Sequence, residues 1–180
     1  MHYTLCDYLS DIVQNSIEAN SSEIIVAFEE NHNYYNFMII DNGKGMSEEI
    51  QKKAIDPFYT EAGKHSMRKA GFGLPFLIMA TQLCEGIFDL QSKIEVGTTI
   101  KYSFAKKSID TPPVGNFAET VTTIFNLSGN CNIIIKRKLN GKEYSISRDD
   151  LVDALGELES VFSLSLAKQY LSGLEDEISS

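Results

Sequence analysis

The stretch YYNFMIIDNGKGM, residues Tyr34–Met46, indicates how the centre of this chain folds. Its first seven residues are rich in aromatic and β-branched side chains, as is typical of a strand, and a similar run at 24–28 precedes it. The polar residues 29–33 between the two runs indicate a hairpin-like connection. The glycines of DNGKG allow positive φ, so we expect the second strand to end in a loop that begins with Asp41.

The loop that begins at Asp41 has two interpretations. It can be an ordinary turn rich in Asp and Gly. Alternatively, the Asp41 carboxylate at the strand end accepts a hydrogen bond from an exocyclic amine, while Gly43 and Gly45 let the backbone approach a flat ring closely. These residues alone leave both interpretations open.

An amphipathic helix is predicted over residues 3–20, because apolar residues recur there at helical spacing. Its apolar face contains Leu5, Leu9, Ile12, Val13, Ser16 and Ile17. Asp11, Asn15 and Glu18 lie on the opposite face. Such a stripe usually marks the solvated side of a helix, but an Asn carbonyl beside carboxylates could also supply oxygen ligands to Mg²⁺.

The next segment contains a long loop between two helices. Residues 56–72 have weak periodicity and mixed charge, as is typical of a functional lid. Gly71-Phe72-Gly73-Leu74 then leads directly into a helix, which makes either an anion site at the helix N-terminus or simply a flexible start to the helix. Helices are predicted at 48–55, capped by Ser47, and at 74–84, and strands at 86–91 and 98–104.

The last third of the chain has its own set of elements. Residues 106–115 include Pro112-Pro113 and indicate a linker. Residues 116–180 contain an Asn-Gly hairpin signal between helices and predict a small α+β module or an oligomer contact, such as that of a homodimer. The predicted helices are 117–127, 148–155 and 159–177, and the strands are 132–138 and 143–147. The final helix is too apolar for a lone tail, so we expect it to pack on the domain or on another chain.

Composition excludes several functional classes. The 180 residues include 16 Lys and Arg against 25 Asp and Glu, a net charge of −9, which disfavours nucleic acid as a ligand. The apolar runs are much shorter than a membrane span of about 18 residues, and the N-terminus does not resemble a signal peptide. Three well-separated cysteines predict buried thiols in a reducing cytoplasm.

Taken in order, five motifs resemble those of the GHKL family, which includes gyrase-type ATPases, heat-shock chaperones, histidine kinases and mismatch-repair ATPases. The matching segments are the N box Asp11–Ala19, the first glycine box Asp41–Met46, the phenylalanine box Asp56–Thr60, the second glycine box Gly71–Leu74 and the Gly-Thr motif Gly97–Thr99. The resemblance covers roughly residues 3–104. It implies the Bergerat ATP-binding fold.

That fold is an α/β (α+β) two-layer sandwich, with a mixed, mostly antiparallel sheet and helices on one face. The predicted organisation is a histidine kinase-like ATP-binding domain over residues 1–105, a linker over 106–115 and a C-terminal helix-hairpin-helix appendage over 116–180.

The resemblance also implies roles for the adenine end of the site. Asp41 would accept from the adenine amino group, with Thr98 supporting it through water. Gly43 and Gly45 would admit the ring, and Met46 belongs to the same box.

At the phosphate end, the resemblance implies that Asn15 holds Mg²⁺ and, through it, the phosphates of ATP. The lid would close over the triphosphate. Backbone N–H groups of the second glycine box would face the phosphates. The resemblance implies these further binding residues: Phe58, Thr60, Gly71, Phe72, Gly73 and Leu74.

Two departures from the family pattern bear on chemistry. ATPases of the family have Glu at the position of Asp11, as the base that activates water, and Asp is one methylene shorter. His2, His32 and His65 match no phosphoacceptor motif of a histidine kinase.

We therefore expect a stand-alone, regulatory Mg-ATP-binding protein similar to histidine kinases and anti-sigma-factor serine kinases, which transfers phosphate to a partner protein. The alternative is a nucleotide-gated clamp or scaffold with slow hydrolysis and no transfer to protein, and the sequence leaves open which of the two applies.

Overall fold

The computed structural model describes residues 4–56 and 73–180. The helices are α1 (Leu5–Glu18), α2 (Glu48–Ala54), α3 (Gly73–Leu83), α4 (Phe117–Leu127), α5 (Arg148–Leu155) and α6 (Val161–Ser179). The strands are β1 (Glu23–Glu30), β2 (Tyr34–Asp41), β3 (Phe88–Lys93), β4 (Gly97–Ala105), β5 (Asn132–Leu139) and β6 (Lys142–Ser147). Each predicted helix and strand in the described ranges is present, with shifts at several ends.

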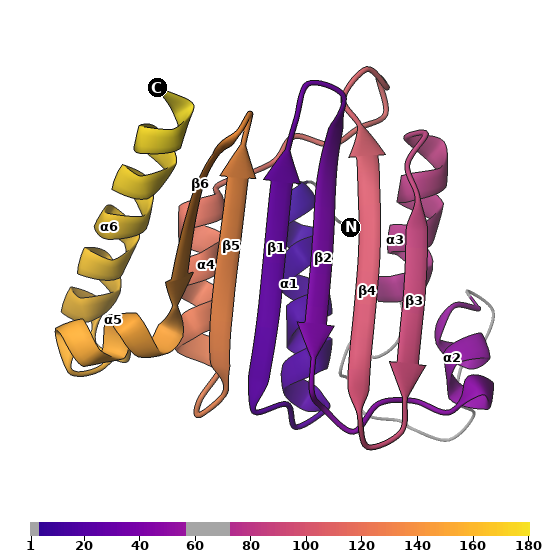
Figure 1. Cartoon of the computed structure of the whole chain (residues 1–180), viewed down its shortest axis with the longest axis horizontal. Coiled ribbons are helices and arrows are strands. Elements are labelled where there is room, and N and C mark those ends of the chain that lie inside the picture. The colour runs from indigo at the N-terminus through magenta and orange to yellow at the C-terminus, as the bar shows by residue number, and fades with distance from the viewer. Residues whose placement is uncertain (1–3, 57–72) are drawn as a thin grey trace.

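The strands form one six-stranded sheet in the order β3-β4-β2-β1-β5-β6. Every neighbouring pair is antiparallel except β1 and β5, which run parallel. Figure 1 shows α1 and α4 behind this sheet, with α3 beside β3 and α6 beyond β6. The prediction of a mixed, mostly antiparallel sheet with helices on one face is confirmed.

Buried and less buried residues alternate along the strands, and the buried ones form a core between the sheet and the helices. Residues Ile24, Val26 and Phe28 of β1 are buried, while the residues between them are only half-buried. Across the sheet, Phe28 stacks on Phe37 with ring centroids 4.3 Å apart, and Phe37 stacks on Tyr102 at 4.9 Å. The apolar face of α1 closes this core, because Leu5, Leu9, Ile12 and Val13 are all buried.

Two element ends differ from the predicted ones for local reasons. The strand predicted to begin at Gly86 begins at Phe88, because the Gly86 N–H donates to the Thr81 carbonyl of α3 and the Ile87 N–H donates to the Ser103 hydroxyl instead of to a strand carbonyl. The last helix begins at Val161 and not at 159, because the Ser160 hydroxyl accepts from the Ser163 N–H as an N-cap.

The segment expected as a C-terminal module contributes to the same sheet and core. Its first strand, β5, pairs along the whole of β1, from Glu23↔Asn132 to Glu30↔Leu139. Helix α4 packs against α1, and Phe117 at its start lies 5.2 Å from Phe28 between ring centroids. The functional division between the two segments stays a prediction.

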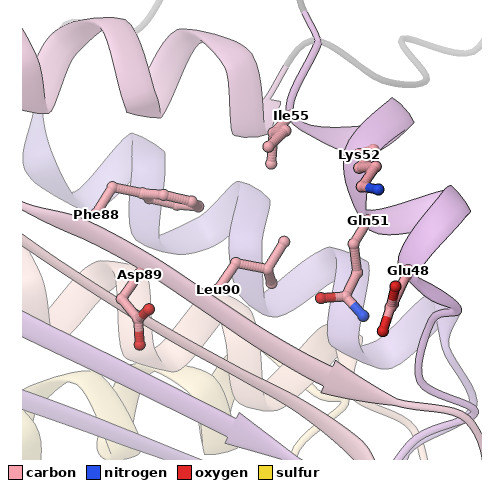
Figure 2. A pocket seen from close by; sticks show the side chains of 7 residues that line it. All are labelled: Glu48, Gln51, Lys52, Ile55, Phe88, Asp89 and Leu90. Atoms are coloured by element: carbon pink, nitrogen blue, oxygen red, sulfur yellow. The ribbon is translucent and has the colours of Figure 1, made fainter.

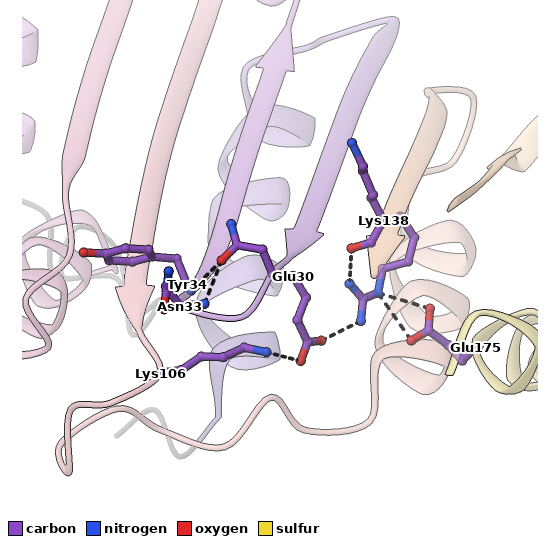
Figure 3. Close-up of polar contacts among 8 residues, drawn as sticks. Glu30, Asn33, Tyr34, Lys106, Lys138 and Glu175 are labelled. Atoms are coloured by element: carbon purple, nitrogen blue, oxygen red, sulfur yellow. Dashed lines mark hydrogen bonds and ion pairs between the residues drawn. The ribbon is translucent and has the colours of Figure 1, made fainter. Parts of the chain in front are cut away.

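An ion cluster around the buried Arg137 joins the two segments (Figure 3). Arg137 on β5 is only 3% exposed, and its guanidinium lies 2.9 Å from Glu30 of β1 and 3.3 Å from Glu175 of α6. Glu30 also pairs with Lys106 at 2.8 Å. Burial alone raises the pKa of Glu30, but hydrogen bonds and the charges of Lys106 and Arg137 outweigh it, so the pKa is lowered.

The cysteine and membrane predictions can also be compared with the structure. Cys6, Cys84 and Cys131 are free and buried, as expected. Burial raises the pKa of the Cys6 thiol to about 11. Within residues 4–56 and 73–180, no helix combines the length and apolar character that crossing a bilayer requires.

Candidate functional site

The centre of the candidate site is the carboxylate of Asp41, the last residue of β2. The residue is 7% exposed, and three groups of the chain donate hydrogen bonds to it. Oδ1 accepts from the Gly43 N–H at 2.9 Å and from the Thr98 N–H at 3.2 Å, and Oδ2 accepts from the Ser16 hydroxyl at 2.8 Å. The carboxylate is therefore fixed by a strand, a loop and α1 before any ligand arrives.

These contacts leave one acceptor position open. An ionised carboxylate has about four lone-pair sites, two on each oxygen. The two backbone N–H groups occupy both sites on Oδ1, whereas Ser16 occupies one on Oδ2. The remaining site on Oδ2 of Asp41 can accept from an N–H group of a ligand.

The glycines after Asp41 are required by the chain's own packing. Gly45 has φ +62°, and an added Cβ would lie 2.0 Å from the Lys93 carbonyl oxygen. Gly43 does not have positive φ, but its Cβ would lie 2.6 Å from the Ser21 hydroxyl oxygen. Of the two glycines that were expected to allow positive φ, only Gly45 adopts it, and crowding against the end of α1 explains Gly43.

Ser92 on β3 is part of the site although the sequence analysis did not identify it. Its Oγ accepts from the Met46 N–H at 2.9 Å and lies 3.1 Å from the Gly97 carbonyl oxygen and 2.8 Å from Thr98 Oγ1. The carbonyl can only accept, so the Ser92 proton is directed to it. All three contacts are satisfied together only if the Thr98 hydroxyl donates to Ser92, which leaves Thr98 Oγ1 as an acceptor toward the site.

The sequence analysis placed Ser16 correctly on the apolar face of the first helix but did not identify its role in the site. The residue does lie on the buried side of α1, but its hydroxyl serves Asp41. A lone hydroxyl within an otherwise apolar stripe is the signal that could have identified it, because a buried polar group requires a partner.

The polar face of α1 lies beside the start of α3. Asp11 is half-buried, and Asn15 and Glu18 are exposed. A Cβ added at Gly73, the first residue of α3, would lie 3.5 Å from Asp11 Oδ2. The structure thus brings the N box and the end of the second glycine box together, as the resemblance implies. Leu74 follows in the first turn of α3 and is half-buried.

Part of the expected site cannot be compared with the structure. Phe58, Thr60, Gly71 and Phe72 lie outside the described residues, as does the expected lid.

A hollow of about 400 Å³ lies between α2 and β3 (Figure 2), and its lining includes no residue of the Asp41 cluster, which consists of Ser16, Asp41, Gly43, Ser92 and Thr98. It is lined by Glu48, Gln51, Lys52, Ile55, Phe88, Asp89 and Leu90, none of which is a predicted site residue. Gln51 connects the two regions, because its Nε2 donates to the Met46 carbonyl at 3.1 Å and to the Ser92 carbonyl at 2.9 Å. Helix α2 is therefore attached both to the glycine loop and to β3.

The chain resembles histidine kinases in sequence. It is 29% identical over 102 residues to the sensor histidine kinase YvrG of Bacillus subtilis (strain 168), a match that covers 55% of this chain but 18% of that protein.

Solved structures of histidine kinases are similar as well. A nucleotide-free form of the catalytic domain of histidine kinase ThkA matches 56% of this chain and 64% of that chain, with 20% identity and a TM-score of 0.42. The histidine kinase domain of the Escherichia coli osmosensor EnvZ matches 55% of this chain and 62% of that chain, with 20% identity and a TM-score of 0.39. The chain thus spans less than two thirds of each of these relatives.

A family model described as "Histidine kinase-, DNA gyrase B-, and HSP90-like ATPase" matches residues 3–108, which is more than half of the chain. This range includes α1, the Asp41 cluster and the hairpin that carries Ser92 and Thr98. The chain therefore belongs to the histidine kinase-, DNA gyrase B- and HSP90-like ATPase family.

Proposed function

We propose that this protein binds Mg-ATP through the Asp41 cluster and the polar face of α1, and that it regulates a partner protein by phosphorylating it. Membership of an ATPase family supports ATP as the ligand. The observation that carries the proposal is the open acceptor site on Asp41 Oδ2, held in place by three internal donors.

Asp41 favours adenine over guanine. The exocyclic amine of adenine donates to Oδ2, whereas guanine has an acceptor oxygen at that position and would leave two acceptors facing each other. Thr98 Oγ1, whose proton is directed to Ser92, can accept from a water molecule that donates its other hydrogen to adenine N1.

The polar face of α1 would serve the phosphates. The Asn15 side-chain carbonyl would be the protein ligand of Mg²⁺, which keeps several waters and shares phosphate oxygens. Within the described ranges, no cluster of three His, Cys, Asp or Glu residues offers an alternative cation site. The N-terminus of α3, with Gly73 and Leu74, would direct backbone N–H groups to the triphosphate.

We propose that Asp11 is a weak base for hydrolysis, so that transfer to a protein is the main reaction. The second candidate is a nucleotide-gated clamp or scaffold that hydrolyses ATP slowly without phosphorylating a protein, and the shorter Asp11 side chain supports slow hydrolysis in both cases. We place the protein in the cytoplasm, with residues 1–105 binding nucleotide and residues 116–180 serving a partner.

Calorimetric titration with ATP and GTP, each with and without Mg²⁺, tests the binding proposal. We expect ATP to bind more tightly than GTP and Mg²⁺ to strengthen only triphosphate binding. Equal affinity for ATP and GTP would refute the role of Asp41.

A second experiment distinguishes kinase from clamp. The protein is incubated with ATP labelled at the γ-phosphate, together with co-purifying protein, and the label is followed into water, into protein or into neither. Label in a partner supports the kinase, and label that stays in ATP or reaches water slowly supports the clamp.

A further inference from the structure

Helix α6 has an exposed apolar face outside the family match. Its inner face packs on α4, β5 and β6 through the buried residues Ser163, Ala167, Leu171 and Ile178. On an adjacent face, an outer stripe consists of Phe162, Leu166 and Tyr170, which are 73%, 36% and 55% exposed. Phe162, Leu166 and Tyr170 follow at intervals of four, so they lie in one row along the helix.

Helix α6, which carries the outer stripe, lies at one end of the molecule. In Figure 1, α6 runs beyond β6 along the edge of the sheet, with no other labelled element on its far side. A contiguous row of large apolar side chains on a helix is typical of a surface that binds another protein. Its spacing fits a second helix, which would place its own apolar row against these side chains.

Gly173 continues the same face, three residues after Tyr170. An added Cβ there would meet no atom within 4 Å outside its own helix and chain neighbours. Glycine inside a helix is less stable than alanine by about 1 kcal/mol, so the packing of this chain gives no reason for it. Close approach of another backbone is a reason, because the missing side chain leaves room for it.

The charges around the outer stripe are acidic. Glu159 precedes it, and Asp176 and Glu177 follow it, all exposed. The single lysine of α6, Lys168, is paired with Glu119 of α4 at 3.1 Å. A second copy of α6 would bring acidic ends against acidic ends in either orientation, whereas a basic helix would be attracted.

We propose that the outer stripe of α6 binds a basic amphipathic helix of a partner protein, with its closest approach at Gly173. This surface does not depend on nucleotide binding, so it can be tested separately from the proposed function.

The test uses a designed helical peptide of about 20 residues. Its apolar face carries leucine and alanine and its flanks carry lysine, and a twin peptide has glutamate at every lysine position. Binding to the full chain is measured by fluorescence anisotropy. We expect the lysine peptide to bind and the glutamate peptide to bind at least about tenfold more weakly, as for like charges facing each other.

Neutral substitutions separate a docked helix from general attraction to an acidic protein. The double variant Phe162→Ala/Tyr170→Ala keeps every charge, and we expect it to weaken binding of the lysine peptide about tenfold or more. Ile109→Ala is the matched control, because Ile109 is 98% exposed but lies outside α6. Gly173→Ala should raise the Tm and still weaken binding, a combination that a purely structural glycine would not produce.

Three results would overturn the proposal. These are equal binding of the two peptides, binding that the double variant leaves unchanged, and a dimer of the chain, seen by sedimentation, that the double variant dissociates. The last result would make a second copy the occupant of the stripe.

Discussion

Substituting Asp41 by asparagine should separate ligand recognition from folding, because the two oxygens of the carboxylate have different partners. Asparagine can keep an oxygen at the position of Oδ1, where the N–H groups of Gly43 and Thr98 donate. Its amide nitrogen then replaces Oδ2, and the Ser16 hydroxyl can rotate to accept from it. All internal hydrogen bonds are retained, so we expect a small change in the free energy of unfolding, about 1 kcal/mol or less.

Binding of ATP, in contrast to folding, should be weakened in the Asp41→Asn variant. The position that accepts from the adenine amine now carries an N–H group, so two donors face each other. Loss of a hydrogen bond to a charged group corresponds to about 1.5–3 kcal/mol. ATP should therefore bind roughly 10- to 150-fold more weakly, since each 1.4 kcal/mol is a factor of about ten.

Alanine at position 41 is the contrasting variant. It removes the acceptor of two buried N–H groups and of the Ser16 hydroxyl, each of which is destabilised by about 1–3 kcal/mol when left unpaired. Its Tm should fall clearly, whereas that of the asparagine variant should stay close to the wild type. Calorimetry with ATP and thermal unfolding of the three proteins give both quantities. ATP affinity within twofold of the wild type in a folded Asp41→Asn protein would show that Oδ2 does not receive the ligand.

Substitutions at four other residues test separate parts of the molecule. Asn15→Ala should remove the effect of Mg²⁺ on ATP affinity while adenosine binding stays intact, and the same magnesium enhancement in the variant would exclude Asn15 as the ligand. Asp11→Glu should raise the rate of phosphate release, and Asp11→Asn should change it little, because misplacing a base by about 1 Å can lower the reaction rate around 10²-fold. If the wild type instead turned over several ATP per second and Asp11→Asn abolished this turnover, Asp11 would be a competent base. Ser92→Ala should weaken ATP binding about fivefold, as for one lost neutral hydrogen bond, in a titration where GTP affinity changes less. Arg137→Ala should lower the free energy of unfolding in urea by about 1.5–3 kcal/mol, because the half-buried carboxylates of Glu30 and Glu175 lose the guanidinium while Glu30 keeps Lys106.

Acid should destabilise the wild-type protein through the same ion cluster. The folded state holds the pKa of Glu30 below its ordinary value, so the unfolded state takes up the proton first as the pH falls. The contribution of Glu30 is complete at neutral pH and is lost on acidification through its folded pKa. Urea titrations between neutral pH and about pH 3 measure it, and Glu30→Gln should flatten that pH dependence.

The sequence predicted the elements and the fold well because both depend on short-range patterns and on a series of motifs. The helical spacing of α1 and the strand composition of β2 are local properties, and so is the cap at Ser47, whose side chain accepts from the Ile50 N–H as expected. Local patterns do not contain the pairing of strands that are distant in sequence. The insertion of β5 next to β1 was therefore not predicted, although both strands were.

The same limit explains which site residues were missed. Asp41 and Thr98 have roles that the motifs imply, whereas no motif assigns a role to Ser16, although it lies within the N box, or to Ser92. Ser16 lies 25 positions from Asp41, and Ser92 lies 46 positions from Met46. The role of Ser92 results from the register of β2, β4 and β3, in which Asp41 pairs with Thr98 and Thr98 pairs with Ser92. The role of Ser16 results from the packing of α1 against β2.

The parallel pairing of β1 with β5 sets a lower limit on the length of chain that can exist alone. Residue 108, where the family match ends, precedes β5, so a chain ending there would expose the whole free edge of β1, an eight-residue strand. A long apolar edge of this kind recruits other strands and leads to aggregation. A fusion protein that contains the ATPase segment would therefore also have to include β5. Otherwise the host protein would have to supply a strand that pairs with β1 in its place.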